Sequence, residues 1–268
     1  MRLLLPRPEP TDTAPSLTAP PGPTVPATAS ATSQLDDAAL FALYDPPDRT
    51  VPSLRMNFVT SVDGAVTVDG YSEGLSNDPD QRVFRLLREV CDALMVGAGT
   101  LRTEGYGALT LDQGRRSRRV ARGLAPVPPL VVVSSSLDLS PDHPMFADAP
   151  VRPLLLTHAG SPADRRAALG TVADVLVHGD AAVDLAAGLA DLAARGLTQV
   201  LSEGGPTLFG SLVAADLVDE LCLTVSPLLT GAGADRIVTG YATPAVRPLR
   251  LAHLVEADGV LLTRYVRA

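Results

Sequence analysis

Short apolar segments alternate with amphipathic segments along most of this chain, and that alternation constrains the fold more than any other feature. Apolar runs of strand length occupy 54–61, 93–96, 130–134, 154–157, 172–177, 198–201, 220–225 and 260–267. Helical patterns lie between several of them, at 78–92, 181–194 and 206–214. Strands that alternate with helices predict an α/β fold with a mainly parallel central sheet. No helical pattern separates the last two runs, so we expect an antiparallel edge there.

The first 33 residues differ in composition from the rest. They hold eight prolines among many Ala, Thr and Ser residues. Such a segment cannot bury enough apolar surface to offset the entropy lost on ordering. We therefore expect residues 1–33 to be a dispensable disordered tail and residues 34–268 to form a single domain. A short helix is expected at 36–43, and segments 114–122 and 138–150 are expected to be loops.

The charged residues and cysteines exclude several functions. The formal net charge is −8 and all 22 basic residues are Arg, so no lysine is present for Schiff-base chemistry or a phosphate loop. An acidic chain is a poor general binder of nucleic acid, and no segment has the apolar length of a membrane span. Cys91 and Cys222 are too few for a zinc site. We expect no metal, and buried thiols in a reducing cytoplasm.

Two of the apolar runs end in glycine-rich turns that open helices. The first turn contains Gly97, Gly99 and Thr100. In such a turn the backbone N–H groups can approach an anion closely, which suits the pyrophosphate of a dinucleotide, although an ordinary tight turn is the alternative. The second, Val-Leu-Ser-Glu-Gly-Gly-Pro-Thr-Leu at 200–208, has the same layout. Its proline suits the first position of a helix.

Acidic residues accompany the strand ends. Glu203 is expected at the carboxyl end of a central strand, where α/β sheets bind ligands, and its carboxylate could accept bonds from ring N–H groups or a ribose; a solvated loop acid is the alternative. Asp63 lies in a Ser-Val-Asp-Gly turn, and the polar loop 70–76 is a candidate wall for a substrate. The alternative for Asp63 is plain turn chemistry, in which the side chain bonds its own backbone.

These motifs resemble the reductase domain of the bifunctional riboflavin deaminase/reductase, the RibD C-terminal type, and are most similar to its stand-alone members. The resemblance runs from about residue 54 to the C-terminus. It is carried by Ser-Val-Asp-Gly at 61–64, Leu-Leu-Arg at 86–88, Asp-Ala through Gly-Thr at 92–100, Arg-Thr-Glu-Gly-Tyr-Gly at 102–107, Glu-Gly-Gly-Pro-Thr-Leu at 203–208, Leu-Val-Asp-Glu-Leu at 217–221 and Pro227. The His-x-Glu and Pro-Cys-x-x-Cys strings of a zinc deaminase do not occur.

The resemblance implies a dihydrofolate-reductase-like three-layer fold and a homodimer. It also implies NADPH as hydride donor and 5-amino-6-(5-phosphoribosylamino)uracil as the small-molecule substrate, whose ribose is reduced to ribityl. By motif position, the residues implied to bind NADPH are Thr60, Gly97, Gly99, Thr100, Glu104, Ser134, Ser135, Gly204, Gly205, Pro206, Thr207 and Leu208. Those implied to bind substrate are Ser72, Arg88, Leu109 and Glu203. The candidate catalytic acids are Asp63, Glu104 and Glu203, with water as the alternative proton donor, because no histidine lies in these motifs.

Several choices stay open at this level. A dihydrofolate-type (pterin) reductase would share the expected fold, and a non-catalytic NADP(H)-binding regulator would keep the same glycine turns. The ribose phosphate could be bound by an arginine run that is otherwise a solvated loop: Arg115, Arg116, Arg118 and Arg119. The hydroxyl run at 134–136 favours NADPH over NADH, because hydroxyls can bind a 2′-phosphate. The dimer contact is expected at 220–227, where an apolar strand would leave a sheet edge exposed.

Overall fold

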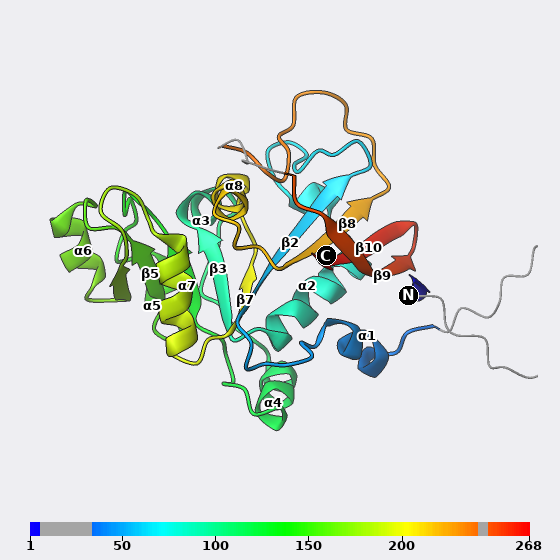
Figure 1. Cartoon of the computed structure of the whole chain (residues 1–268), viewed down its shortest axis with the longest axis horizontal. Helices are drawn as coiled ribbons and strands as arrows, with labels where there is room; N and C mark the ends of the chain where they lie inside the picture. The colour runs from blue at the N-terminus through cyan, green and yellow to red at the C-terminus, as the bar shows by residue number, and fades with distance from the viewer. Residues whose placement is uncertain (6–33, 241–245) are drawn as a thin grey trace, which may run out of the picture.

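One ten-stranded sheet organises the molecule (Figure 1). The computed structural model describes residues 1–5, 34–240 and 246–268. The strands are β1 (Arg2–Leu5), β2 (Ser53–Ser61), β3 (Ala93–Gly97), β4 (Leu130–Val133), β5 (Leu154–Thr157), β6 (Asp174–Val177), β7 (Gln199–Ser202), β8 (Glu220–Ser226), β9 (Leu249–Ala257) and β10 (Val260–Arg267). Their order across the sheet is β1-β9-β10-β8-β2-β7-β3-β4-β5-β6.

The sheet is parallel through most of its width and antiparallel at one side. The strands from β8 through β2, β7, β3, β4 and β5 to β6 pair in parallel. Beyond β8, the pairs β8–β10, β10–β9 and β9–β1 are antiparallel. The expected mainly parallel sheet with an antiparallel edge is confirmed. Because parallel strands all end on the same side, the turns that follow β2, β3 and β7 come close together there.

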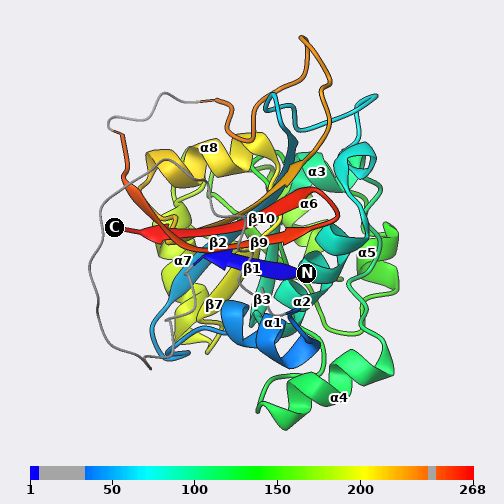
Figure 2. The same ribbon diagram turned by 90° about the vertical axis from the view of Figure 1, so that its right-hand side faces the viewer.

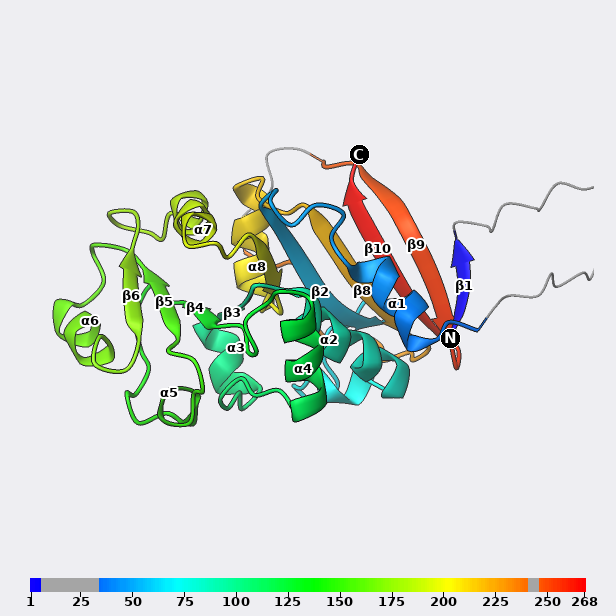
Figure 3. The ribbon, with the colours of Figure 1, turned by 90° about the horizontal axis from the view of Figure 1, so that it is seen from below.

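Helices cover both faces of this sheet, which gives three layers (Figures 2 and 3). The helices are α1 (Asp37–Tyr44), α2 (Asp78–Val90), α3 (Ala98–Thr103), α4 (Gln113–Ala121), α5 (Pro144–Ala147), α6 (Ala163–Leu169), α7 (Leu185–Ala194) and α8 (Pro206–Ala214), with a 3₁₀ turn at Glu73–Leu75. Apolar residues of α1, α2, α3 and α5 join one core, and those of α7 and α8 join the other. Among the described residues, no helix is both long and apolar enough to cross a membrane.

The strands have continuous apolar sequences because both of their faces are buried. In β3, Leu94 and Val96 belong to the core under α2, whereas Ala93 and Met95 belong to the core under α7 and α8. All four side chains are fully buried. The same alternation recurs in β4 and β5. Burial on two faces therefore makes these short strands recognisable in the sequence.

Helix α2, which carries Arg88 in its last turn, is held in place at both of its ends. The Asn77 side chain accepts a bond from the N–H of Asp80, and Pro79 lies in the first turn. Along its inner face Val83, Leu87 and other apolar residues are buried. At its other end, the guanidinium of the buried Arg119 donates to the carbonyls of residues 88, 89 and 91, so α4 is fastened to the C-terminus of α2.

Two predicted loops contain helices. Segment 114–122 lies mostly in α4, and 138–150 contains α5. The loop prediction for α4 was wrong because the helix has no apolar stripe; its one buried residue is Arg119, which bonds carbonyl groups. Strand β9 and helix α6 were not predicted. The expected edge at β8 was also wrong, because β8 pairs on both sides, with β2 and β10.

The chain's first residues belong to the sheet. Residues 2–5 form β1, which pairs with β9, and Arg2 forms an ion pair with Glu256. The expectation of disorder is therefore wrong for these residues. A run of three leucines that follows an arginine can complete a sheet edge even when it precedes a proline-rich segment. The rest of the expected tail, 6–33, lies outside the described residues.

Candidate active site

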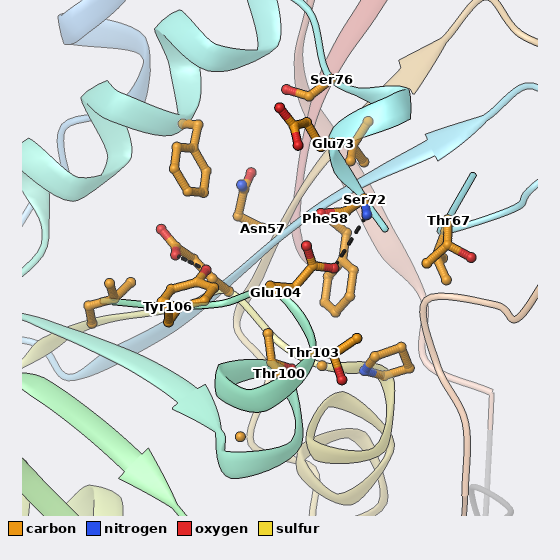
Figure 4. A pocket seen from close by; sticks show the side chains of 18 of the residues that line it. Asn57, Phe58, Thr67, Ser72, Glu73, Ser76, Thr100, Thr103, Glu104 and Tyr106 are labelled. Atoms are coloured by element: carbon orange, nitrogen blue, oxygen red, sulfur yellow. Dashed lines mark hydrogen bonds between the residues drawn. The ribbon is translucent and has the colours of Figure 1, made fainter. Parts of the chain in front are cut away.

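A pocket of about 1140 Å³ opens where β2, β3 and β7 meet α2, α3 and α8 (Figure 4). Small-molecule sites typically measure about 300–1,000 Å³, so this one has room for a dinucleotide and a second ligand. Most residues expected to bind cofactor or substrate line it: Ser72, Arg88, Gly97, Gly99, Thr100, Glu104, Leu109, Glu203, Gly205, Pro206, Thr207 and Leu208. The pocket therefore gathers segments that lie far apart in the sequence.

The two glycine turns contact each other at one end of the pocket. The N–H of Gly97 donates to the carbonyl of Gly204 at 2.7 Å. A Cβ on Gly205 would lie 2.5 Å from Oγ1 of Thr100, so the turns approach more closely than any side chain would allow. Helix α8 is preceded by Gly205, which provides no side-chain cap, and its first turn contains no acid. Its free N–H groups and positive end suit an anion.

Two side chains that line the pocket donate hydrogen bonds to Glu203. Its Oε1 accepts from Arg88 Nε at 2.6 Å, and its Oε2 accepts from Arg88 Nη2 at 2.6 Å and from Tyr106 Oη at 2.7 Å. The Glu203 side chain is 2% exposed. This bidentate pair fixes the plane of the guanidinium, which also lies 4.2 Å from the centre of the Phe84 ring.

The cluster of Arg88, Glu203 and Tyr106 is electrically balanced. Burial alone would lower the pKa of Arg88, but the Glu203 carboxylate raises it above its usual value. Burial raises the pKa of the Tyr106 hydroxyl, and the Glu203 charge raises it further. Arg88 therefore stays cationic and Tyr106 stays protonated. Tyr106 was not singled out from the sequence as a site residue; the only signal was its place in the Gly-Tyr-Gly stretch of the family resemblance.

Glu104 ends α3 and reaches the middle of the pocket. Figure 4 shows its carboxylate directed toward Ser72, whose N–H donates to Oε1 at 3.3 Å. Nothing else in the described residues bonds this carboxylate, so its remaining lone pairs face the cavity. Of the three candidate catalytic acids, Glu104 and Glu203 line the same pocket.

Asp63, the third candidate, lies outside the pocket lining. Its carboxylate accepts from Ser61 Oγ at 2.5 Å and from the N–H of Gly231 at 2.8 Å, with weaker bonds from Thr230. The hydroxyl of Ser61 and the N–H of Gly231 hold the pKa of this carboxyl well below its usual range. Asp63 thus ties the end of β2 to the loop after β8.

Four residues expected at the cofactor do not line the pocket. One of them, Gly204, accepts from the N–H of Gly97 at the contact between the glycine turns. Thr60 is buried near the end of β2. Ser134 is buried after β4, where its Oγ accepts from the N–H of Leu137. Ser135 is exposed beside it. The arginines Arg102 and Arg165 converge there, donating to the carbonyls of residues 138 and 137.

The arginine run lies in α4, away from the pocket. Arg118 binds Glu89 through two bonds of 2.7 Å, and Arg115 lies near the same carboxylate. Arg119 is 1% exposed, and its guanidinium donates hydrogen bonds to main-chain carbonyls. These side chains join α4 to α2, and none of the four arginines lines the pocket.

The end of the pocket opposite the glycine turns is acidic, and the sequence motifs did not predict this. It is formed by residues around the start of α2, including Glu73, Ser76, Asp78, Asp80 and Gln81. Asp80 is buried and accepts from Ser76 Oγ at 2.5 Å. Burial raises the pKa of the Asp80 carboxyl, whereas bonds from Ser76 and Thr224 oppose that rise. The helix start was visible in the sequence, but its orientation toward a cavity was not.

Both cysteines are free and buried. Burial raises the pKa of Cys91 to about 12 and that of Cys222 to about 11. The thiolate is the reactive form, so neither sulfur is activated as a nucleophile.

The chain is similar to known reductases along most of its length. The family model for the RibD C-terminal domain matches residues 52–262. A 2,5-diamino-6-ribosylamino-4(3H)-pyrimidinone 5′-phosphate reductase from Archaeoglobus fulgidus is 30% identical over 181 residues, covering 67% of this chain and 82% of that protein. The enzyme of the same name from Methanothermobacter thermautotrophicus is 31% identical, with 67% and 80% covered.

A solved structure is similar as well. The crystal structure of a pyrimidine reductase-like protein from Corynebacterium diphtheriae superposes with a TM-score of 0.73 at 27% identity, covering 81% of this chain and 92% of that one. The riboflavin biosynthesis protein RibD of Mycobacterium tuberculosis is 27% identical, and the match spans 44% of its length.

Proposed function

Because the chain belongs to the RibD C-terminal domain family, we propose that it is the NADPH-dependent reductase of 5-amino-6-(5-phosphoribosylamino)uracil. The similar proteins include pyrimidinone 5′-phosphate reductases and the riboflavin biosynthesis protein RibD. The observation that carries the proposal is a single pocket that joins two contacting glycine turns to the cluster of Arg88, Glu203 and Tyr106. One end of the pocket suits a dinucleotide and the other suits a polar heterocycle.

The glycine end fits a nicotinamide dinucleotide. The uncapped start of α8 offers N–H groups to a pyrophosphate, and the close contact of Gly205 with Thr100 leaves backbone exposed to the ligand. For NADPH in particular, support comes from the exposed Ser135 and from the guanidinium groups of Arg102 and Arg165, which lie at the neighbouring residues 137 and 138. Guanidinium and hydroxyl groups are the usual partners of a phosphate.

The chain's own residues orient the substrate. NADPH, when bound, supplies the hydride, and the protein must hold the ribosyl C1′ within near-attack distance of it. Glu203 fixes Arg88 and Tyr106, and the guanidinium N–H groups that Glu203 leaves free can donate to the pyrimidine carbonyls. Glu104 extends from α3 toward the middle of the cavity and can accept from hydroxyls of the sugar. Phe58 and Phe84 line the pocket and help to exclude water.

The test is NADPH oxidation by the purified protein with the aminouracil substrate and, in parallel, with dihydrofolate. Turnover of the aminouracil alone supports the proposal. Turnover of dihydrofolate alone would assign the protein to the pterin reductases, and cofactor binding without any turnover would indicate a regulator. A titration with NADPH and NADH checks the cofactor: equal affinities would contradict the preference for NADPH.

A further inference from the structure

The interior of the pocket is a poor place for the phosphate that the proposed substrate carries. Among the described residues, the lining includes one guanidinium, that of Arg88, and its charge is matched by Glu203 through two bonds of 2.6 Å. The lining also includes six carboxylate side chains: Glu73, Asp78, Asp80, Glu104, Glu203 and Asp235. A phosphate dianion placed among them would be repelled. The phosphate therefore needs a cation at the rim of the pocket.

Helix α2 carries such a cation on the face that it turns toward the pocket. Gln81 and Arg88 both line the pocket from this helix. Arg85 lies four residues after Gln81 and three before Arg88, and this spacing places the three side chains on one face of a helix. Asp78, another lining residue, lies two turns before Arg85 on the same face. Arg85 is exposed, whereas Gln81 and Arg88 are partly buried, so Arg85 belongs to the rim of the pocket.

The guanidinium of Arg85 is available to a ligand. In the part of the chain that the structure describes, no hydrogen bond or ion pair engages it. Its neighbours differ in this respect: Arg82 on α2 pairs with Asp37, and Arg118 on α4 pairs with Glu89. A guanidinium whose donors are not used within the protein can bind a phosphate through two parallel hydrogen bonds.

The position of Arg85 along α2 also suits the substrate. Three residues of an α-helix span about 4.5 Å along its axis, so Arg85 lies less than one turn from Arg88. In the proposed binding mode, the N–H groups of Arg88 that Glu203 leaves free donate to the pyrimidine. The ribosyl chain separates that ring from the phosphate. The two arginines can therefore contact one substrate molecule, Arg88 at its ring and Arg85 at its phosphate.

Two other arginines, Arg116 and Arg236, likewise have no ion-pair partner among the described residues, but their positions are less suitable. Arg236 follows the lining residue Asp235 in the loop after β8, and the adjacent carboxylate weakens its attraction for an anion. Arg116 is exposed on α4, where Arg115 and Arg118 are the residues that reach α2. Both serve as comparisons for Arg85.

We propose that Arg85 binds the 5′-phosphate of the substrate at the rim of the pocket and thereby makes the phosphate ester the preferred substrate. This role of Arg85 rests on the proposed function, which it deepens by naming the residue that recognises the phosphate. The cluster of Arg88, Glu203 and Tyr106 holds the heterocycle, and Arg85 holds the other end of the same molecule. A charge-assisted contact of this kind changes an affinity by about 10- to 100-fold.

The first experiment compares kcat/KM for the phosphate ester and for the same compound after phosphatase treatment. The wild type should favour the ester by about tenfold or more. Arg85→Gln should lose most of this preference, because kcat/KM falls for the ester and stays nearly unchanged for the dephosphorylated compound. Arg85→Lys keeps the charge without the paired donors and should retain part of the preference. Added salt should reduce the preference of the wild type, since it screens the attraction.

Matched variants decide whether the effect belongs to Arg85. Arg116→Gln and Arg236→Gln make the same charge change elsewhere, and both should keep the preference for the ester. The assignment would be overturned by an unchanged preference in Arg85→Gln, or by an equal loss for both compounds. A selective loss in Arg236→Gln alone would overturn it too, because the phosphate would then be bound by the loop after β8. Thermal denaturation should give the same melting temperature for Arg85→Gln and the wild type, since Arg85 is exposed.

A binding experiment separates failure of this assignment from failure of the proposed function. Calorimetry measures binding of the two ribityl products, with and without phosphate, to the NADP⁺-loaded protein. If neither substrate is reduced, the proposed function fails, yet the ratio of the two dissociation constants still tests Arg85. Tighter binding of the phosphorylated product by the wild type, by about tenfold, that disappears in Arg85→Gln supports the assignment. Equal binding of the two products by the wild type, or binding of neither, would refute it.

Discussion

Glu203 connects the substrate end of the pocket to the sheet, and its role differs from the one its sequence position suggested. The sequence indicated a carboxylate free to bind a substrate ring. In the structure its oxygens are taken up by Arg88 and Tyr106, so it acts by orienting those two donors. No motif could reveal this, because Arg88 lies 115 residues earlier and its direction depends on how α2 packs on β7.

We expect Glu203→Gln to lower both stability and turnover. The amide keeps the shape but leaves the guanidinium of Arg88 without its counter-charge, which costs about 3 kcal/mol for a buried pair. Turnover should fall on the order of 100-fold, because Arg88 loses its fixed orientation. Melting temperature and kcat measure the two effects. Tyr106→Phe is the matched control: it removes one bond to Glu203 but keeps the ion pair, so it should cost only about 1 kcal/mol. Wild-type activity in Glu203→Gln would contradict this account.

The buried His253 should make the stability of the folded protein depend on pH. It is buried against the edge of the Tyr44 ring, and its Nε2 has no partner in the described residues. Burial, with the nearby Arg264 and Arg55, lowers the pKa of this imidazole to about 4. The folded state thus holds the neutral ring. Its contribution to stability is complete above the unfolded-state pKa and is lost as pH falls from about 6.5 through about 4.

In His253→Phe, the unfolding free energy should fall less steeply over that pH range. The difference should be on the order of 3 kcal/mol between neutral pH and pH 4, because the shift from 6.5 to about 4 corresponds to that energy. Denaturant titrations at several pH values measure it. His143→Gln, which changes a less buried histidine, serves as control. Equal acid sensitivity in wild type and His253→Phe would show that another group dominates.

At the scale of elements, prediction from sequence succeeded where burial is regular and failed where polar contacts replace it. The runs in β2, β3, β5 and β10 were predictable because they are apolar on both faces or end in recognisable turns. Helix α4 was not, because guanidinium bonds to carbonyls and to Glu89 hold it in place of an apolar stripe. The glycine turns were predictable as an anion site, whereas the acidic wall at the start of α2 depends on packing alone.

The contact between the glycine turns can be tested by Gly205→Ala. The new Cβ would lie 2.5 Å from Oγ1 of Thr100, so either the Thr100 side chain or the turns must shift. We expect NADPH affinity to fall by about tenfold or more, as a displaced pair of backbone donors would give. Adding Thr100→Ala removes the clashing atom and should restore part of the loss. Gly99→Ala is the control, since a Cβ there meets no atom within 4 Å. If Gly205→Ala and Gly99→Ala behaved alike, the close approach would not matter.

At the scale of the whole molecule, the sheet has two edges, β1 and β6, and β1 comes from the start of the chain. We expect removal of residues 1–5 to expose β9 and to increase self-association, because an uncovered strand is a template for pairing. The melting temperature should fall as well. Light scattering and thermal denaturation check both. Arg2→Gln keeps the strand but loses the ion pair with Glu256, and it should change little. If the truncated protein were as stable and monodisperse as Arg2→Gln, residues 1–5 would be dispensable.

The exposed apolar side chains of the molecule predict its oligomeric state. Exposed apolar side chains gather near the ends of β2 and β8: Val62, Leu228 and Leu229, the last 82% exposed. The N–H of Val62 donates to the carbonyl of Leu228, so these residues are neighbours. We expect a homodimer that covers this patch. Light scattering should report a dimer at micromolar concentration, and Leu229→Arg should shift it toward monomer. Val246→Arg changes a side chain that is even more exposed but lies outside this patch, and it should not shift the dimer. A wild-type monomer would contradict this.

The bond between Arg88 and Glu203 joins two halves of the polypeptide that meet only in the finished sheet. β7, which ends next to Glu203, lies between β2 and β3, two strands from the first half of the chain. If the backbone were cut in the exposed turn at 179–182, neither fragment would contain a complete pocket. Catalysis would return only if the second fragment threaded β7 back between its neighbours. The protein could therefore be developed as a split reporter, in which recovered activity measures how well a central strand is reinserted.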